Sequence, residues 1–128
     1  MARETVLVVD DSPSNLKLLR VILESEGYDV HTAGDAEEAL RLVQTVRPRL
    51  IVTDIHLPGE GGLDLTRRIK GEPLTRDVVV LAVTGCALKG DESRARAAGC
   101  DGYITKPFDI EALKRLIAGL LARAGGKS

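Results

Sequence analysis

Short apolar runs alternate with longer segments of helical periodicity along this chain, and no other feature restricts the fold as strongly. The apolar runs cover residues 6–10, 49–54, 78–83 and 103–105, and residues 28–33 form a weaker run with alternating polarity. Parallel strands that are covered on both faces have no polar side, so they occur in sequence as continuous apolar stretches. The alternation therefore predicts an α/β domain with five parallel strands and five helices, with residues 78–83 central in the sheet.

The segments between the apolar runs carry residues that begin helices. Helices are expected over residues 14–27, 36–47, 63–70, 89–98 and 110 to about 121. Asp35, followed three residues later by Glu38, matches a capping box, and Asp109 can cap the last helix. With no repeat or linker to divide the chain, we expect one domain over residues 5–122 and a frayed tail over residues 123–128.

Polar side chains follow the strands where the strands end. Right-handed crossovers favour a doubly wound five-stranded parallel sheet of order 2-1-3-4-5, which binds ligands at the carboxyl ends of strands one and three. At these ends stand Asp10 and Asp11 after strand one, Asp54 after strand three, Thr84 after strand four and Lys106 after strand five. Each residue alone is typical of an ordinary turn or strand end. Their joint placement at one edge of the sheet indicates a functional site.

The charges of this cluster suggest its chemistry. Three carboxylates and one ammonium group sum to about −2, which favours a hard divalent cation such as Mg²⁺, held through oxygen ligands and water. Mg²⁺ with a lysine and a threonine hydroxyl resembles a site for a transferring phosphoryl group. Asp54 ends an apolar strand in the middle of the crevice, so it is better placed for nucleophilic attack than the pair Asp10 and Asp11.

Four stretches of the sequence resemble the receiver domains of two-component response regulators. They are VVDDSPSN, IVTDIHLPGEGGL, AVTG and GYITKPF, and the resemblance covers about residues 5–122. The segment VLAVTGCALKGDESRARAAGCDGYITKP is most similar to single-domain receivers and to the receivers of hybrid kinases. The resemblance implies a flavodoxin-like (CheY-like) fold and a phosphoacceptor signalling domain. Such a domain is not an enzyme with a separate substrate, although it carries intrinsic self-phosphorylation and self-dephosphorylation chemistry.

The resemblance also assigns roles to individual residues. It implies that Mg²⁺ is bound by Asp10, Asp11, Asp54 and the main-chain carbonyl of His56. The phosphoryl group would come from a histidine kinase or a histidine phosphotransfer domain onto Asp54, and Thr84 and Lys106 would bind its oxygens. A cis peptide bond between Lys106 and Pro107 would aim the lysine at the site. Tyr103 stands where the family has an aromatic residue that turns inward on activation, although a purely packing role for it stays open.

The expected output is protein binding. Phosphorylation adds charge to an anionic pocket, and closure around it should alter the surface of helix 89–98 and the last helix. Asn15, Leu16 and Phe108 are by resemblance candidates for the face that docks the kinase, with Leu16 as a core residue the alternative. Phosphorylation-dependent homodimerisation also stays open.

Other partners and compartments are disfavoured by charge and hydropathy. Eighteen basic and nineteen acidic residues give a net charge of −1, so the chain has no strong positive potential that would attract nucleic acid or an anionic membrane. No apolar run approaches the roughly 18 residues of a spanning helix, and the first residues lack the apolar core of a signal peptide. We therefore expect a cytoplasmic protein.

Two other functions remain as alternatives. A Mg²⁺-dependent phosphohydrolase similar to haloacid dehalogenases also uses an aspartate nucleophile, but those enzymes carry a second aspartate two residues later, where this chain has Ser12 or His56. A receiver kept only as a binding scaffold would not need the full set of titratable residues. His56 and Cys86 depart from the commoner receiver pattern, and we expect them to influence the lifetime of the phosphoryl group unless His56 is merely solvated.

Overall fold

Five parallel strands form one sheet in the order β2-β1-β3-β4-β5, as the sequence predicts. A computed structural model describes residues 4–57, 61–85 and 89–125 of the chain. The strands are β1 (Thr5–Val9), β2 (Asp29–Ala33), β3 (Leu50–Asp54), β4 (Val79–Thr84) and β5 (Gly102–Thr105). All six residues of β4 are buried, but β3 is the middle strand and β4 lies beside it. As an interior strand between β3 and β5, β4 is covered on both faces, which explains its apolar run.

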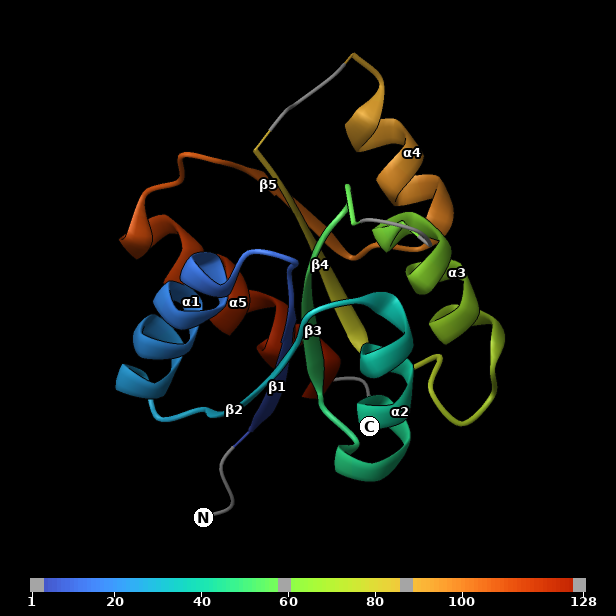
Figure 1. Cartoon of the computed structure of the whole chain (residues 1–128), viewed down its shortest axis with the longest axis horizontal. Helices are drawn as coiled ribbons and strands as arrows, with labels where there is room; N and C mark the ends of the chain where they lie inside the picture. The colour runs from blue at the N-terminus through green and yellow to red at the C-terminus, as the bar shows by residue number, and fades with distance from the viewer. Residues whose placement is uncertain (1–3, 58–60, 86–88, 126–128) are drawn as a thin grey trace.

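Helices cover both faces of this sheet. They are α1 (Pro13–Ser25), α2 (Ala36–Val46), α3 (Gly62–Gly71), α4 (Asp91–Ala98) and α5 (Ile110–Gly125). Figure 1 shows α1 and α5 on one side of the sheet and α2, α3 and α4 on the other. This is the doubly wound arrangement. It places the carboxyl ends of the strands, and the connections that lead from them to the helices, at one edge of the sheet.

The helix ends follow the local chemistry of the sequence, although α1 ends at Ser25, two residues before the expected end, and α4 begins at Asp91, two residues after the expected start. The carboxylates of Asp35 and Asp109 accept hydrogen bonds from Glu38 N at 2.8 Å and Ala112 N at 3.2 Å, so both predicted caps are confirmed. The last helix continues to Gly125, beyond the end expected near Leu121. Leu120 and Leu121 are both buried, and this packing supports the helix at the point where we expected it to end.

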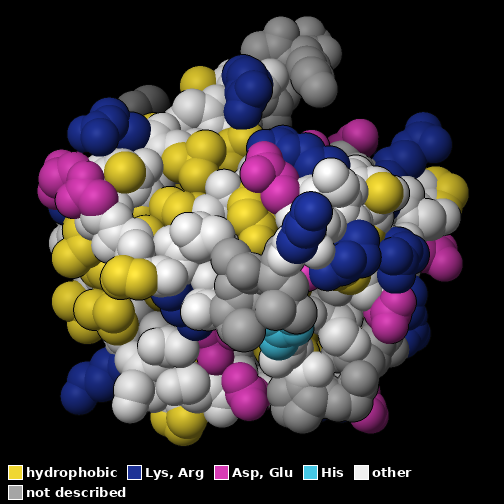
Figure 2. All heavy atoms as spheres, turned by 90° about the horizontal axis from the view of Figure 1, so that it is seen from above, with side chains coloured by type: hydrophobic (Ala, Val, Ile, Leu, Met, Phe, Trp, Pro, Cys, Tyr) yellow, Lys and Arg dark blue, Asp and Glu magenta, His cyan; other side chains and the backbone are white. Residues whose placement is uncertain are grey.

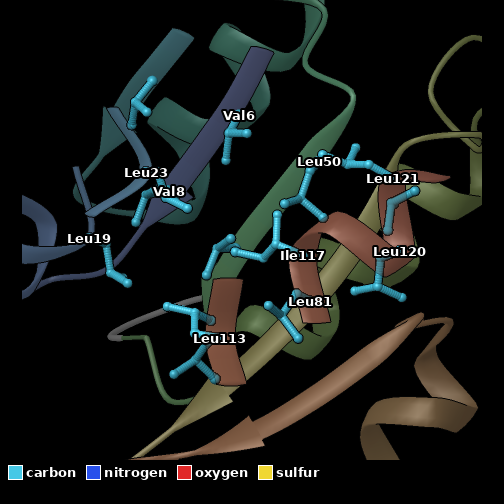
Figure 3. Packing of buried hydrophobic residues seen from close by; sticks show 14 residues of the cluster. Val6, Val8, Leu19, Leu23, Leu50, Leu81, Leu113, Ile117, Leu120 and Leu121 are labelled. Carbon is cyan, nitrogen blue, oxygen red and sulfur yellow. The ribbon is translucent and has the colours of Figure 1, made fainter. Parts of the chain in front are cut away.

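The core has one layer on each side of the sheet. Neighbouring residues of a strand point to opposite faces, so Val6 and Val8 join the cluster under α1 and α5, whereas Leu7 and Val9 join the cluster under α2 and α3. Figure 3 shows the first cluster, in which Ile117 of α5 lies among side chains from the strands and α1. The rigid sheet between these layers fixes the positions at which the strands end. None of the helices in the described ranges is long and apolar enough to cross a lipid bilayer.

Candidate functional site

Three carboxylates come together at the carboxyl ends of β1 and β3. Asp10, Asp11 and Asp54 each offer one oxygen, and these oxygens all lie within 4.8 Å of one another. Asp10 is buried, Asp54 is half-buried and Asp11 is exposed to solvent. Carboxylate oxygens at this spacing, partly open to water, suit a hard cation that keeps several water ligands, as Mg²⁺ does. The donor set therefore fits the predicted metal.

The buried carboxylate of Asp10 is held by three donors. Its Oδ1 accepts a hydrogen bond from Ser12 N at 2.9 Å, and its Oδ2 lies 3.3 Å from Asn15 Nδ2 and 3.2 Å from Lys106 Nζ. Burial of a charge is costly unless the charge is paired and hydrogen-bonded, and these donors supply that compensation. The structure thus brings Asn15 into the site, where the sequence had suggested a docking role for it. The sequence signal for this contact was the position of Asn15 in the first turn of α1, just after the acidic pair.

Asp54 and Lys106 face each other across the site. Asp54 Oδ1 accepts a hydrogen bond from His56 N at 2.8 Å, and Asp54 Oδ2 lies 3.6 Å from Lys106 Nζ. The main-chain N–H of Lys106 also donates to the carbonyl of Thr84 at 2.7 Å, which ties the end of β5 to the end of β4. The Lys106–Pro107 peptide bond is cis, as the resemblance implies. One lysine therefore contacts two of the three carboxylates.

Thr84 ends β4, the strand next to the one that carries Asp54, and Tyr103 lies on β5, one strand further along the sheet. In the register of the sheet Asp54 lies opposite Val83, so Thr84 is one residue beyond the position opposite Asp54. The side chain of Thr84 is fully buried. Tyr103 is half-buried and packs against the cluster that contains Ala95 of α4. Partial burial raises the pKa of the Tyr103 phenol, and the nearby charge of Asp91 raises it further. Tyr103 thus packs against the core in this structure, and the role of Tyr103 as a switch stays a prediction.

The side chain of His56 points toward α4. Its Nε2 lies 3.5 Å from Oδ2 of Asp91, the first residue of that helix. Sequence reasoning missed Asp91, because an acidic residue in the first turn of a helix normally needs no explanation beyond the helix dipole. Cys86, the other departure from the common pattern, lies outside the described residues.

The comparisons with known proteins agree with this geometry. The family model for the response regulator receiver domain matches residues 6–118. The chain belongs to this family. The polar-differentiation response regulator DivK of Brucella anthropi is 39% identical over 121 residues, which are 94% of this chain and 98% of that protein. DivK of Brucella ovis is 38% identical over 121 residues, with the same coverage.

Solved receiver structures share the fold. A CheY-like response regulator receiver domain protein from Methanospirillum hungatei matches with a TM-score of 0.93 at 30% identity, over 99% of this chain and 100% of that one. A response regulator from Chloroflexus aurantiacus matches with a TM-score of 0.90 at 30% identity, over 94% of this chain and 99% of that one. The flavodoxin-like, CheY-like fold and the receiver family are confirmed. The chain is thus a signalling domain of two-component systems, which disfavours the phosphohydrolase alternative.

Proposed function

We propose that this receiver domain, over residues 5–122, accepts a phosphoryl group on Asp54 from a histidine kinase or a histidine phosphotransfer protein. The observation that carries the proposal is the meeting of Asp10, Asp11, Asp54 and Lys106 at the ends of three strands, with Asp54 half-buried between metal-type ligands and an ammonium group. An Asp54 oxygen attacks phosphorus, and the bond from phosphorus to the donor's imidazole nitrogen breaks with its electron pair going to that nitrogen.

The charge of the transferred group is the main physical difficulty of this step. Asp10, Asp11, Asp54 and the carbonyl of His56 would hold Mg²⁺, which neutralises negative charge on the phosphoryl oxygens when it is bound. Lys106 lies 3.6 Å from Asp54 and supplies a second, fixed positive charge. Thr84, at the end of the neighbouring strand, would donate its hydroxyl to a phosphoryl oxygen. Its complete burial means that the side chain or its cover must move for this contact to form.

That movement is the proposed signal. A phosphoryl group adds roughly −1.5 to −2 charge at neutral pH, so the phosphorylated state is stable only if Lys106 and Thr84 close on it. Tyr103 packs between β5 and α4, so it can follow Thr84 and alter the face formed by residues 89–98 and α5. The downstream partner is then a protein that reads this face, or a second copy of the chain, and neither nucleic acid nor a membrane.

The donor would dock beside α1. Leu16 and Phe108 are only partly buried and pack on the core, while three apolar side chains nearby in the fold are more open. These are Leu18 at 49% exposure, Val21 at 58% and Ile110 at 42%. Figure 2, which looks onto the strand ends, shows apolar side chains gathered on the side that carries α1 and the start of α5. Such a face beside an exposed acidic site suits a helical kinase or phosphotransfer domain in the cytoplasm.

Labelling tests the proposed chemistry directly. The purified chain is incubated with acetyl phosphate and Mg²⁺ and analysed by intact mass. We expect one phosphoryl group per chain, and we expect chelation of the metal to prevent its uptake, because the three carboxylates would then repel the incoming anion. Uptake that is equal with and without chelator would contradict the proposed role of the metal, and no uptake would contradict the proposed function.

Thr84→Ala separates chemistry from signalling. We expect this variant to be labelled by acetyl phosphate, because Asp54 and Lys106 remain in place. The phosphorylated variant should lack the full change in amide NMR signals over residues 89–105 that the native chain shows on labelling, since the hydroxyl that closes on the phosphoryl group is missing. A native-like change in Thr84→Ala would show that the coupling runs through other residues.

A further inference from the structure

A continuous set of contacts leads from the proposed acceptor to α4 without passing through Thr84. The main-chain N–H of His56 donates to Asp54 Oδ1 at 2.8 Å, so His56 is held directly beside the acceptor. Its imidazole Nε2 lies 3.5 Å from Asp91 Oδ2, at the beginning of α4. The loop that follows the acceptor is therefore connected to α4 through two side chains.

Asp91 is unusual for a residue in the first turn of a helix. Its side chain is 2% exposed, whereas the histidine that it faces is 45% exposed. Its other oxygen, Oδ1, pairs with the Arg94 guanidinium one turn later in α4. A buried carboxylate is costly unless it is well compensated, and one held in this way has a fixed position. Asp91 is thus a buried acceptor that is held in place, while His56 is the more exposed partner.

We propose that Asp91 is a positioning residue that fixes the His56 imidazole beside Asp54 and thereby shortens the lifetime of the aspartyl phosphate. The proposal rests on the proposed phosphorylation of Asp54. The tautomer that directs its Nε2–H at Asp91 has Nδ1 as its acceptor. Nδ1 is the ring nitrogen nearer to the main chain, which is itself hydrogen-bonded to Asp54. In this position Nδ1 accepts a hydrogen bond from the water that attacks the phosphoryl group.

The hydrolysis step that this arrangement assists is simple to balance. The water oxygen forms a bond to phosphorus, and the bond from phosphorus to the Asp54 oxygen breaks with its electron pair returning to the carboxylate. Inorganic phosphate leaves, and the surplus proton passes to phosphate or solvent. A fixed hydrogen-bond acceptor lowers the entropic cost of placing the water in line, and an imidazole free to rotate does not. Loss of Asp91 should therefore slow the decay.

The contact itself can be tested without any phosphoryl group. The chain has two histidines, and the second one, His31, has its own carboxylate partner, with Nε2 lying 3.4 Å from Asp29 Oδ2. In NMR spectra of the imidazole nitrogens, Asp91→Asn should shift the signals of His56 and leave those of His31 in place. Asp29→Asn is the matched control and should do the reverse. Unchanged His56 signals in Asp91→Asn would overturn the proposal.

The lifetime is tested by a double-mutant cycle on the labelled protein, with decay followed by intact mass in Mg²⁺. We expect Asp91→Asn to slow decay about 3-fold or more, and to change it by less than about 1.5-fold in a His56→Ala background, because Asp91 acts through His56. Glu92→Gln is the matched control, because it changes the neighbouring exposed carboxylate of α4, which pairs with Arg96, and it should leave decay within about 1.5-fold of native. Equal factors in both backgrounds, or no change, would overturn the assignment of Asp91. A native chain that takes up no phosphoryl group would instead overturn the proposed function.

Discussion

Asp54→Ala should take up no phosphoryl group under conditions that label the native chain completely. The substitution removes the attacking oxygen, and the remaining carboxylates cannot replace it, for different reasons. Asp10 is buried and its carboxylate is held by Ser12, Asn15 and Lys106, so it is not open to an incoming phosphodonor as Asp54 is. Asp11 is exposed, and the structure describes no positive charge beside it to stabilise a transferred group. The loss should therefore be complete and not partial.

The control for this variant is another aspartate outside the site. Asp64 lies on α3 with its side chain 61% exposed, and it pairs with Arg67. Asp64→Ala should be labelled at the native rate, since an exposed ion pair contributes little to stability and Asp64 is not part of the acidic cluster. Intact mass after incubation with acetyl phosphate and Mg²⁺ measures both variants. Equal labelling of Asp54→Ala and the native chain would place the acceptor at a different residue.

The sequence was sufficient to predict the sheet and most of the site because both depend on strand ends. A buried parallel strand is apolar throughout, so the first polar residue after it marks its carboxyl end, and the sheet brings such ends together. Asp10, Asp11, Asp54 and Lys106 follow this rule, and the structure brings them together: the three carboxylates lie near one another, and Lys106 pairs with Asp10 and Asp54. Their placement required no knowledge of how the helices pack.

The features that sequence reasoning missed depend on helix packing. Asp91 is buried where α4 comes close to His56 and carries Arg94 one turn later, and neither relation has a local pattern in the sequence. Asn15 reaches Asp10 because α1 begins at Pro13, directly beyond the acidic pair. The length of α5 likewise depends on the burial of Leu120 and Leu121. Contacts between elements, unlike the elements themselves, needed the three-dimensional structure.

One such close approach involves Gly62, the first residue of α3, which lies against the backbone of the acceptor segment. A Cβ at this position would lie 2.2 Å from the carbonyl oxygen of Asp54 and 2.9 Å from Cα of Ile55. Both are backbone atoms of the segment that ends β3, so no side chain can rotate away to relieve the clash. The N–H of Gly62 also donates to the carbonyl of Ile55 at 3.2 Å, which closes the connection between β3 and α3. The absence of a Cβ therefore allows α3 to begin against the strand that carries Asp54.

Gly62→Ala should consequently destabilise the fold by about 3 kcal/mol, at the upper end of the usual cost of overpacking, because β3 and α3 must separate. Gly71, at the other end of α3, is the matched control: a Cβ there meets nothing within 4 Å. Gly71→Ala should leave the free energy of unfolding unchanged or raise it by up to about 1 kcal/mol, since alanine favours the helix. Urea denaturation measures both, and equal midpoints would show that the strand and helix can move apart freely. Folded Gly62→Ala should also be labelled more slowly than Gly71→Ala, because the displaced backbone is that of Asp54 itself.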